Sequence, residues 1–186
     1  MSMLPIVTEE GATGEVAEVY KDIKRGFQIP FVPNFFKIQA ASPQVVAASW
    51  NLVHNILVDG KYVPRTIKEM IFVAISNARK CNYCEAAHLA FCKLLGVDEQ
   101  NREALTTALD TLLPKRTQDI IRFATKVATD PLDVGDEDYR ILREHGVSEG
   151  ELMEIISMAS LATYANIIAD ALKVEVDEDF HKIMES

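Results

Sequence analysis

Apolar residues recur at intervals of three and four along almost the whole chain, whereas sustained alternation of apolar and polar residues is missing. Intervals of three and four are typical of an α-helix that buries one face, and alternation is typical of a half-buried strand. The pattern therefore predicts an all-α protein. We expect a helical bundle of about seven to eight helices.

Capping residues and helix breakers set the expected boundaries. A serine cap precedes a proline at Ser42-Pro43, Ser148 and Glu151 have the spacing of a capping box, and Gly96 is placed to end a helix. The aromatic segment 27–36 holds two prolines and is expected to be a loop. The expected helices cover about Gly14–Gly26, Pro43–Val58, Arg65–Ala78, Tyr83–Leu95, Asp98–Leu113, Pro114–Thr129, Asp136–His145 and Ser148–Leu172.

Composition narrows the class of protein. Of the 186 residues, 48% are hydrophobic and 25% are charged, which excludes collagen-like, low-complexity and wholly disordered chains. The net charge is -9 and no basic cluster is visible, so no nucleic-acid partner is expected. We find no apolar run of the roughly eighteen residues that a membrane span needs, and no signal-peptide pattern at the start. The sequence therefore predicts a cytoplasmic protein without a membrane partner.

Candidate chemistry is concentrated in Cys81-Asn-Tyr-Cys84 and in His88, which follows one helical turn later. Residues three and four apart share one face of a helix, so both thiols and the imidazole lie on one stripe. Cα atoms three residues apart on a helix are roughly 5 to 6 Å apart, which is within the range of a disulfide. The pair can therefore cycle between a dithiol and a disulfide.

The start of this helix decides which thiol is activated. Asn82 and Glu85 have capping-box spacing, which predicts a helix that begins at Tyr83 and holds Cys84 in its first turn. The helix dipole stabilises a thiolate there and His88 can take the proton, so we expect a lowered pKa for Cys84. A shift of the helix start by one or two residues would move this advantage to Cys81.

Glu69 is the candidate carboxylate for proton transfer. It lies in the segment 67–75, which is apolar nearly all round and is therefore expected to be buried. A carboxylate held there would be desolvated, which suits a proton relay near neutral pH. Pairing of Glu69 with Arg65 or Lys68 at the wetter end of the helix is the alternative.

The remaining cysteine and histidines have plainer interpretations. The cysteine pair could be two small core residues, and a structural zinc site would need four ligands where only Cys81, Cys84 and His88 offer themselves. We therefore expect no metal and no cofactor. Cys92 is expected to be a core residue, and packing or surface roles are expected for His54, His145 and His181.

The order Glu69, eleven residues, Cys81-x-x-Cys84, three residues, His88 resembles the alkylhydroperoxidase D and carboxymuconolactone decarboxylase superfamily. Pro64-Arg-x-x-x-Glu69 and Cys84-Glu-Ala-Ala-His88 are similar to its peroxidase-related branch, and Tyr164-Ala-Asn166 resembles that branch's C-terminal helix. The best-known branch has a second histidine where this chain has Tyr83. Superfamily decarboxylases lack the cysteine pair.

The resemblance implies a homo-oligomeric, cofactor-free, antioxidant peroxidase (an oxidoreductase). In it, Cys84 would be the thiol that peroxide oxidises, Cys81 the resolving thiol, and Glu69 and His88 the proton relay. The reductant would be dihydrolipoamide or another external dithiol. Apolar surface near Phe31, Phe35, Phe36 and Trp50 also favours a homo-oligomer.

We expect one all-helical domain over residues 1–186, with a redox core at about 33–96 and a C-terminal half at about 98–174. The expected function is thiol-dependent reduction of hydroperoxides by a dithiol/disulfide cycle. A redox-sensing or disulfide-exchange protein and a lactone decarboxylase are the alternatives.

Overall fold

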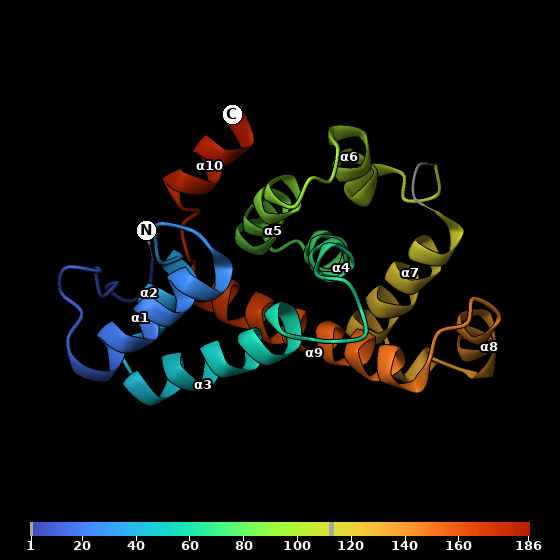
Figure 1. Cartoon of the computed structure of the whole chain (residues 1–186), viewed down its shortest axis with the longest axis horizontal. Coiled ribbons are helices and arrows are strands. Elements are labelled where there is room, and N and C mark those ends of the chain that lie inside the picture. Colours follow the sequence, from blue (N-terminus) through green and yellow to red (C-terminus); the bar gives the residue numbers. More distant parts are fainter. Residues whose placement is uncertain (1, 112–113) are drawn as a thin grey trace.

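A computed structural model describes residues 2–111 and 114–186, which form ten α-helices, one π-helical segment and one 3-10 turn, with no strand among these residues (Figure 1). The helices are α1 (Gly14–Phe27), α2 (Asn34–Gln39), α3 (Pro43–Val53), η1 (His54–Val58, the π-helix), α4 (Arg65–Arg79), α5 (Asn82–Leu94), α6 (Glu99–Thr107), α7 (Lys115–Thr129), η2 (Pro131–Asp133, the 3-10 turn), α8 (Asp136–Glu144), α9 (Glu149–Leu172) and α10 (Glu178–Glu185). The all-α prediction is confirmed.

Helix α4 forms the centre of the molecule. Figure 1 shows it nearly end-on, with α5, α6 and α7 around it, and α9 also packs against it. Every residue from Lys68 to Ser76 is buried, as the all-round apolar sequence of this segment predicts. The side chain of Glu69 is therefore held in the interior by the most enclosed helix of the chain.

The expectation of seven to eight helices is wrong, because two short helices were missed. Helix α2 lies in the aromatic segment that was expected to be a loop. Pro33 is its N-cap residue, where a proline neither breaks a hydrogen bond nor clashes with a preceding turn. Helix α10 has eight residues and buries only Phe180, so its apolar pattern is too short to stand out from the surrounding polar sequence.

Several boundaries also differ from those expected. Helix α5 begins at Asn82 with Cys81 as its N-cap, one residue earlier than predicted. Glu85 does not close a capping box, because its carboxylate accepts a hydrogen bond from the Asn77 side chain at 3.1 Å. Helix α6 ends at Thr107, well before the predicted end near Leu113, which lies outside the described residues. The capping box of Ser148 and Glu151 is confirmed at the start of α9.

The aromatic residues of the N-terminal third form part of the core. Phe31, Phe35, Phe36 and Trp50 are all buried within the chain, and Trp50 packs edge-on against Phe36 with ring centroids 5.8 Å apart. The expectation that these four residues supply spare apolar surface is therefore wrong. They come from α2, α3 and the segment that precedes α2, and this packing is invisible in local sequence.

Helix α9 corrects the expectation that no segment is long and apolar enough to cross a membrane. An 18-residue window within its 24 residues has a mean hydropathy of 1.4, and 44% of that window is buried inside the molecule. Helices α4, α5 and α7 cover its inner face. On length and composition alone, such a helix is equally typical of a protein core.

Candidate active site

Helices α4 and α5 bring the predicted site residues together. Lys80 caps the C-terminus of helix α4 in a left-handed backbone conformation with φ of 60°, and the Cys81 N–H then donates to the Ser76 carbonyl at 2.9 Å. This tight turn folds α5 back onto α4. Cys81 and Cys84 thus lie at the start of α5, and His88 lies one turn later, against Glu69.

Glu69 and His88 form a buried polar contact at the centre of the site. The His88 Nδ1 lies 2.5 Å from Glu69 Oε2, and the imidazole ring stacks on Phe72 with centroids 3.5 Å apart. A carboxylate at Nδ1 orients the ring and favours the tautomer in which Nδ1 carries the hydrogen. The other nitrogen, Nε2, is then left without a hydrogen and can accept one.

The second oxygen of Glu69 pairs with a cation that the sequence offered only as an alternative partner. Arg65 Nε donates to Glu69 Oε1 at 3.2 Å, and the Arg65 guanidinium lies 5.5 Å from the Phe27 ring centre and 5.6 Å from that of Phe91. Glu69 therefore contacts both the predicted relay partner and the predicted ion-pair partner. Lys68, the other candidate, pairs with Glu154 at 2.8 Å.

The two thiols of the motif are free and buried, and Cys84 is 2% exposed. A hydrogen bond with the Cys81 thiol, together with burial, raises the pKa of Cys84 well above its usual range, and the side chain of Asn166 partly opposes this by lowering it. The expectation of a lowered pKa is therefore wrong for this closed, reduced site. The helix start does not compensate for removal from water and for a neighbouring thiol.

Asn166 is a site residue whose role the sequence did not indicate. It comes from α9, is fully buried, and donates from Nδ2 to Ser76 Oγ of α4 at 3.0 Å. Its amide also reaches Cys84, where it stabilises negative charge on sulfur. It lies 82 positions after Cys84, so no local spacing connects the two.

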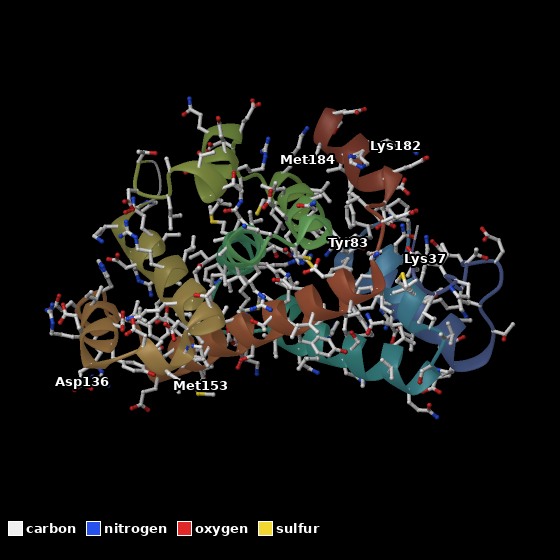
Figure 2. The ribbon with its side chains drawn as sticks, turned by 180° about the vertical axis from the view of Figure 1, so that it is seen from behind. Lys37, Tyr83, Asp136, Met153, Lys182 and Met184 are labelled. Carbon is white, nitrogen blue, oxygen red and sulfur yellow. The ribbon has the colours of Figure 1, made fainter. Side chains whose placement is uncertain are left out.

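Tyr83, between the two cysteines, is held by a second polar cluster. Its hydroxyl accepts a hydrogen bond from the Phe35 N–H at 3.0 Å and donates one to Asp177 Oδ2 at 3.1 Å. Burial and the nearby Asp177 raise the pKa of Tyr83. Figure 2 shows Tyr83 where α5 meets the chain that leads into α10.

A largely apolar pocket opens beside Cys84 and His88. Its empty space is about 430 Å³, including the mouth, but the centre of a water molecule can occupy only about 40 Å³ of it. Aromatic side chains from several helices form most of the wall, among them Phe36, Phe72 and Phe91. The pocket in this state fits a small reactant beside one thiol and one imidazole.

The other cysteine is not among the residues that line the pocket, and two of the other histidines contact aspartates instead. Cys92 is fully buried on α5, where burial and the charge of Glu69 raise its pKa. His54 lies near Asp59 at 3.5 Å, and His145 contacts Asp119 at 2.8 Å. Over the described ranges, no group of three or more His, Cys, Asp and Glu side chains could hold a metal ion.

Comparison with known proteins supports the resemblance. Residues 43–109 match the carboxymuconolactone decarboxylase family, and this stretch includes Glu69, Cys81, Cys84 and His88. No curated protein matches the sequence of the chain.

Solved structures share its fold over nearly the full length. An alkylhydroperoxidase AhpD core, an uncharacterised peroxidase-related protein from Ralstonia eutropha JMP134, has a TM-score of 0.88 at 23% identity, with 96% of this chain and 94% of that chain covered. A peroxidase-related protein from Silicibacter sp. TM1040 has a TM-score of 0.87 at 22% identity, with 97% and 94% covered.

The debrominase Bmp8, solved as a cysteine-to-alanine variant with 2,3,4-tribromopyrrole, has a TM-score of 0.82 at 18% identity, with 100% and 98% covered. Because all three identities are low, these structures establish the fold and not a reaction. Together with the family match, they confirm the resemblance to the alkylhydroperoxidase D and carboxymuconolactone decarboxylase superfamily.

Proposed function

From the family match over residues 43–109 and the shared fold, we propose that the protein is a thiol-dependent peroxidase that reduces hydroperoxides through a Cys81–Cys84 dithiol/disulfide cycle. The observation that carries this proposal is the placement of Cys84 in one pocket with His88, whose Nδ1 is held by the buried Glu69. A nucleophile, a base and a carboxylate that orients the base are the parts that such a reaction needs.

Proton transfer comes first in the proposed reaction. Since the pKa of Cys84 is raised in the closed site, the thiol is protonated at rest, and His88 Nε2 is the base that takes its proton. The Glu69 carboxylate stabilises the imidazolium that results, and Arg65 supplies the countercharge that this carboxylate needs in the interior. Asn166 stabilises the thiolate from the side of α9.

The redox steps balance with one external dithiol. The Cys84 thiolate attacks the terminal oxygen of the hydroperoxide, the O–O bond breaks, and the leaving alkoxide takes the proton from His88. The sulfenic acid on Cys84 then condenses with the Cys81 thiol, which forms the disulfide and releases water. A dithiol of the dihydrolipoamide type, or another external dithiol, reduces the disulfide by thiol exchange. Because the cycle needs a supply of reduced thiols, it favours a location in the cytoplasm.

Matched cysteine variants test the proposal. Cys84→Ser should abolish peroxide consumption with a saturating dithiol, because the attacking atom is gone. Cys81→Ser should give one burst and a trapped sulfenic acid, because only the resolving step is lost. Cys92→Ser is the control, since this thiol lies outside the pocket lining. Full turnover by Cys84→Ser would exclude the proposed reaction.

Reductive dehalogenation is a second candidate. The similar structure Bmp8 is a debrominase, and the aromatic walls of this pocket suit a planar halogenated ring. Both thiols would be oxidised to the disulfide while a carbon–bromine bond becomes carbon–hydrogen and HBr is released. Bromide release from a bromopyrrole, measured beside peroxide turnover, separates the two reactions.

The alternatives from the sequence have equally direct tests. A redox sensor or disulfide-exchange protein would use the same pair but react slowly with peroxide, so the peroxide rate constant separates it from a peroxidase. A lactone decarboxylase would keep its activity after loss of both cysteines. Homo-oligomerisation remains a prediction, and light scattering at micromolar concentration tests it.

A further inference from the structure

A second buried carboxylate lies beside the pocket and has no part in the relay. Asp177 is 4% exposed, and its two oxygens accept the Asn34 N–H at 2.9 and 3.1 Å. One of them also accepts the Tyr83 hydroxyl at 3.1 Å. Asp177 is the residue before α10, so this single carboxylate joins α2, α5 and the start of the last helix.

Helix α10 forms one wall of the pocket through Phe180. This ring packs edge-on against Phe91 at 5.6 Å and against Phe31 at 5.2 Å between centroids. Phe180 is the one fully buried residue of α10, and the helix packs mainly on α5. Figure 2 shows Lys182 and Met184 at its outer end, at the edge of the molecule.

The remaining walls are anchored much more firmly. They belong to longer helices such as α4, α5 and α9, which pack on several neighbours, or to the aromatic cluster of the N-terminal third. Helix α10 has eight residues, of which Phe180 alone is buried. Local opening is expected where few buried apolar contacts must be broken.

The closed pocket has room only for a very small reactant beside Cys84. Cys84 is 2% exposed, and the space open to the centre of a water molecule is about 40 Å³. Hydrogen peroxide is close to water in size, but a reactant with an aromatic or branched group is far larger. Such a reactant reaches Cys84 only if one wall moves.

We propose that Asp177 and Tyr83 are positioning residues that determine which reactants reach Cys84, because they hold α10, with Phe180, as the movable wall of the pocket. With the wall closed, the site takes hydrogen peroxide and comparably small reactants. With the wall open, it takes apolar reactants of aromatic size. The identity of the reaction rests on the proposed function, whereas access to Cys84 does not.

The carboxylate also gives this wall a pH dependence. Burial raises the pKa of Asp177 to about 6, although the Asn34 N–H, the Tyr83 hydroxyl and the charge of Lys37 on α2 oppose the shift. In an open state the carboxyl group would meet water and its pKa would fall to near 3.9. Since the closed state binds the proton more tightly, opening becomes more favourable as the pH rises through about 6.

Two neutral maleimides of different size measure access directly. N-methylmaleimide and N-benzylmaleimide react with the same thiolate, so the ratio of their rates at Cys84 cancels the thiolate fraction. The Cys84 peptide is quantified by mass spectrometry in the reduced full-length protein. For the wild type, the rate with N-benzylmaleimide divided by the rate with N-methylmaleimide should rise several-fold between pH 5 and pH 8, with a midpoint near 6. Asp177→Asn, which removes the titration, should give a flat ratio.

Variants at fixed pH test whether Asp177 and Tyr83 hold α10 in the closed position. At pH 7, Asp177→Ala should raise the ratio about tenfold, and Tyr83→Phe, which keeps the ring and removes the hydroxyl, should raise it less. Asp179→Ala is the matched control, because this exposed carboxylate in the first turn of α10 contacts neither Tyr83 nor Asn34.

The outcomes are distinct. The inference would be overturned if the wild-type ratio stayed flat from pH 5 to pH 8. It would also be overturned if Asp179→Ala gave the same ratio as Asp177→Ala and Tyr83→Phe. The wild-type pH profile decides the matter even if a variant does not fold. A rising ratio in a protein that consumes no peroxide would keep the movable wall and reject the proposed function.

Discussion

Two buried carboxylates lie beside the same pocket, and their partners differ. Glu69 contacts an arginine and a histidine, both of which can carry positive charge. Asp177 accepts only a peptide N–H and a phenol, and it makes no ion pair in the part of the chain that the structure describes. Its pKa is therefore raised to about 6, because burial outweighs the dipoles around it.

The comparison indicates different roles for the two carboxylates. A carboxylate that contacts an imidazole and a guanidinium is placed to stabilise an imidazolium, which suits proton handling at Cys84. A carboxylate that is hydrogen-bonded only by a peptide N–H and a phenol, with a pKa of about 6, gains and loses its proton just below neutral pH, which suits a contact that can be broken. The chemistry is thus placed on the α4–α5 side of the pocket and access on the α10 side.

Replacing each carboxylate by its amide should give the largest contrast. Glu69→Gln should lower peroxide turnover with a saturating dithiol by about 10²- to 10⁴-fold, the range for loss of a general base or its partner. Asp177→Asn should lower turnover with hydrogen peroxide by less than tenfold, because the wall is not needed for the chemistry. Steady-state kinetics at pH 7 measures both. Similar losses in the two variants would end the division of roles.

Removing the countercharge of Glu69 should destabilise the fold. Arg65→Met keeps apolar contact with Phe27 and Phe91 but leaves Glu69 without its cation, which should cost about 3 kcal/mol in the free energy of unfolding. The double variant with Glu69→Gln should be less destabilised than the sum of the two single variants. Urea denaturation measures all three.

Arg25→Met is the matched control for this series, because Arg25 pairs with Asp22 at the surface and should contribute under about 1 kcal/mol. Additive effects of Arg65→Met and Glu69→Gln would show that Arg65 does not stabilise the buried charge.

The pH dependence of stability should separate Asp177 from the other acidic groups. Its pKa is higher in the folded protein than the 3.8 of a free group, so its contribution to stability is present below about pH 4 and is lost as the pH rises through about 6. The free energy of unfolding of the wild type, relative to Asp177→Asn, should fall by at most about 3 kcal/mol between pH 4 and pH 7.5.

Glu154 and Asp119 have lowered pKa values, so their contributions to the free energy of unfolding grow as the pH rises. Both residues are present in the wild type and in Asp177→Asn, so their contributions cancel in this difference. A constant difference across the pH range would show that Asp177 titrates alike in the folded and unfolded chain.

How much of this could be predicted from the sequence depends on the separation of the partners. Cys84 and His88 lie on one helix and Cys81 is its N-cap, so spacing indicated these three residues. For Glu69, on the preceding helix, spacing left a relay and an ion pair open, and the resemblance favoured the relay. Asp177 lies 94 positions after Tyr83 and 143 after Asn34, and nothing local connects them. Chain topology brings them together.

Short elements were also beyond the sequence pattern. Pro33 was interpreted as a helix breaker, whereas it caps α2, and either role fits the same local sequence. The pKa of Cys84 was misjudged for a related reason. The helix start was predicted to within one residue and the two thiols were expected to lie close together, but the burial of Cys84 and the effect of the Cys81 thiol on its pKa were not foreseen.

Mapping the bond that forms on oxidation tests the central claim most directly. The reduced protein is treated with one equivalent of hydrogen peroxide, and its intact mass and cysteine peptides are determined. The account predicts a loss of two hydrogen atoms and a single disulfide between Cys81 and Cys84. A disulfide mainly through Cys92, or three thiols left unchanged while the peroxide is consumed, would contradict it.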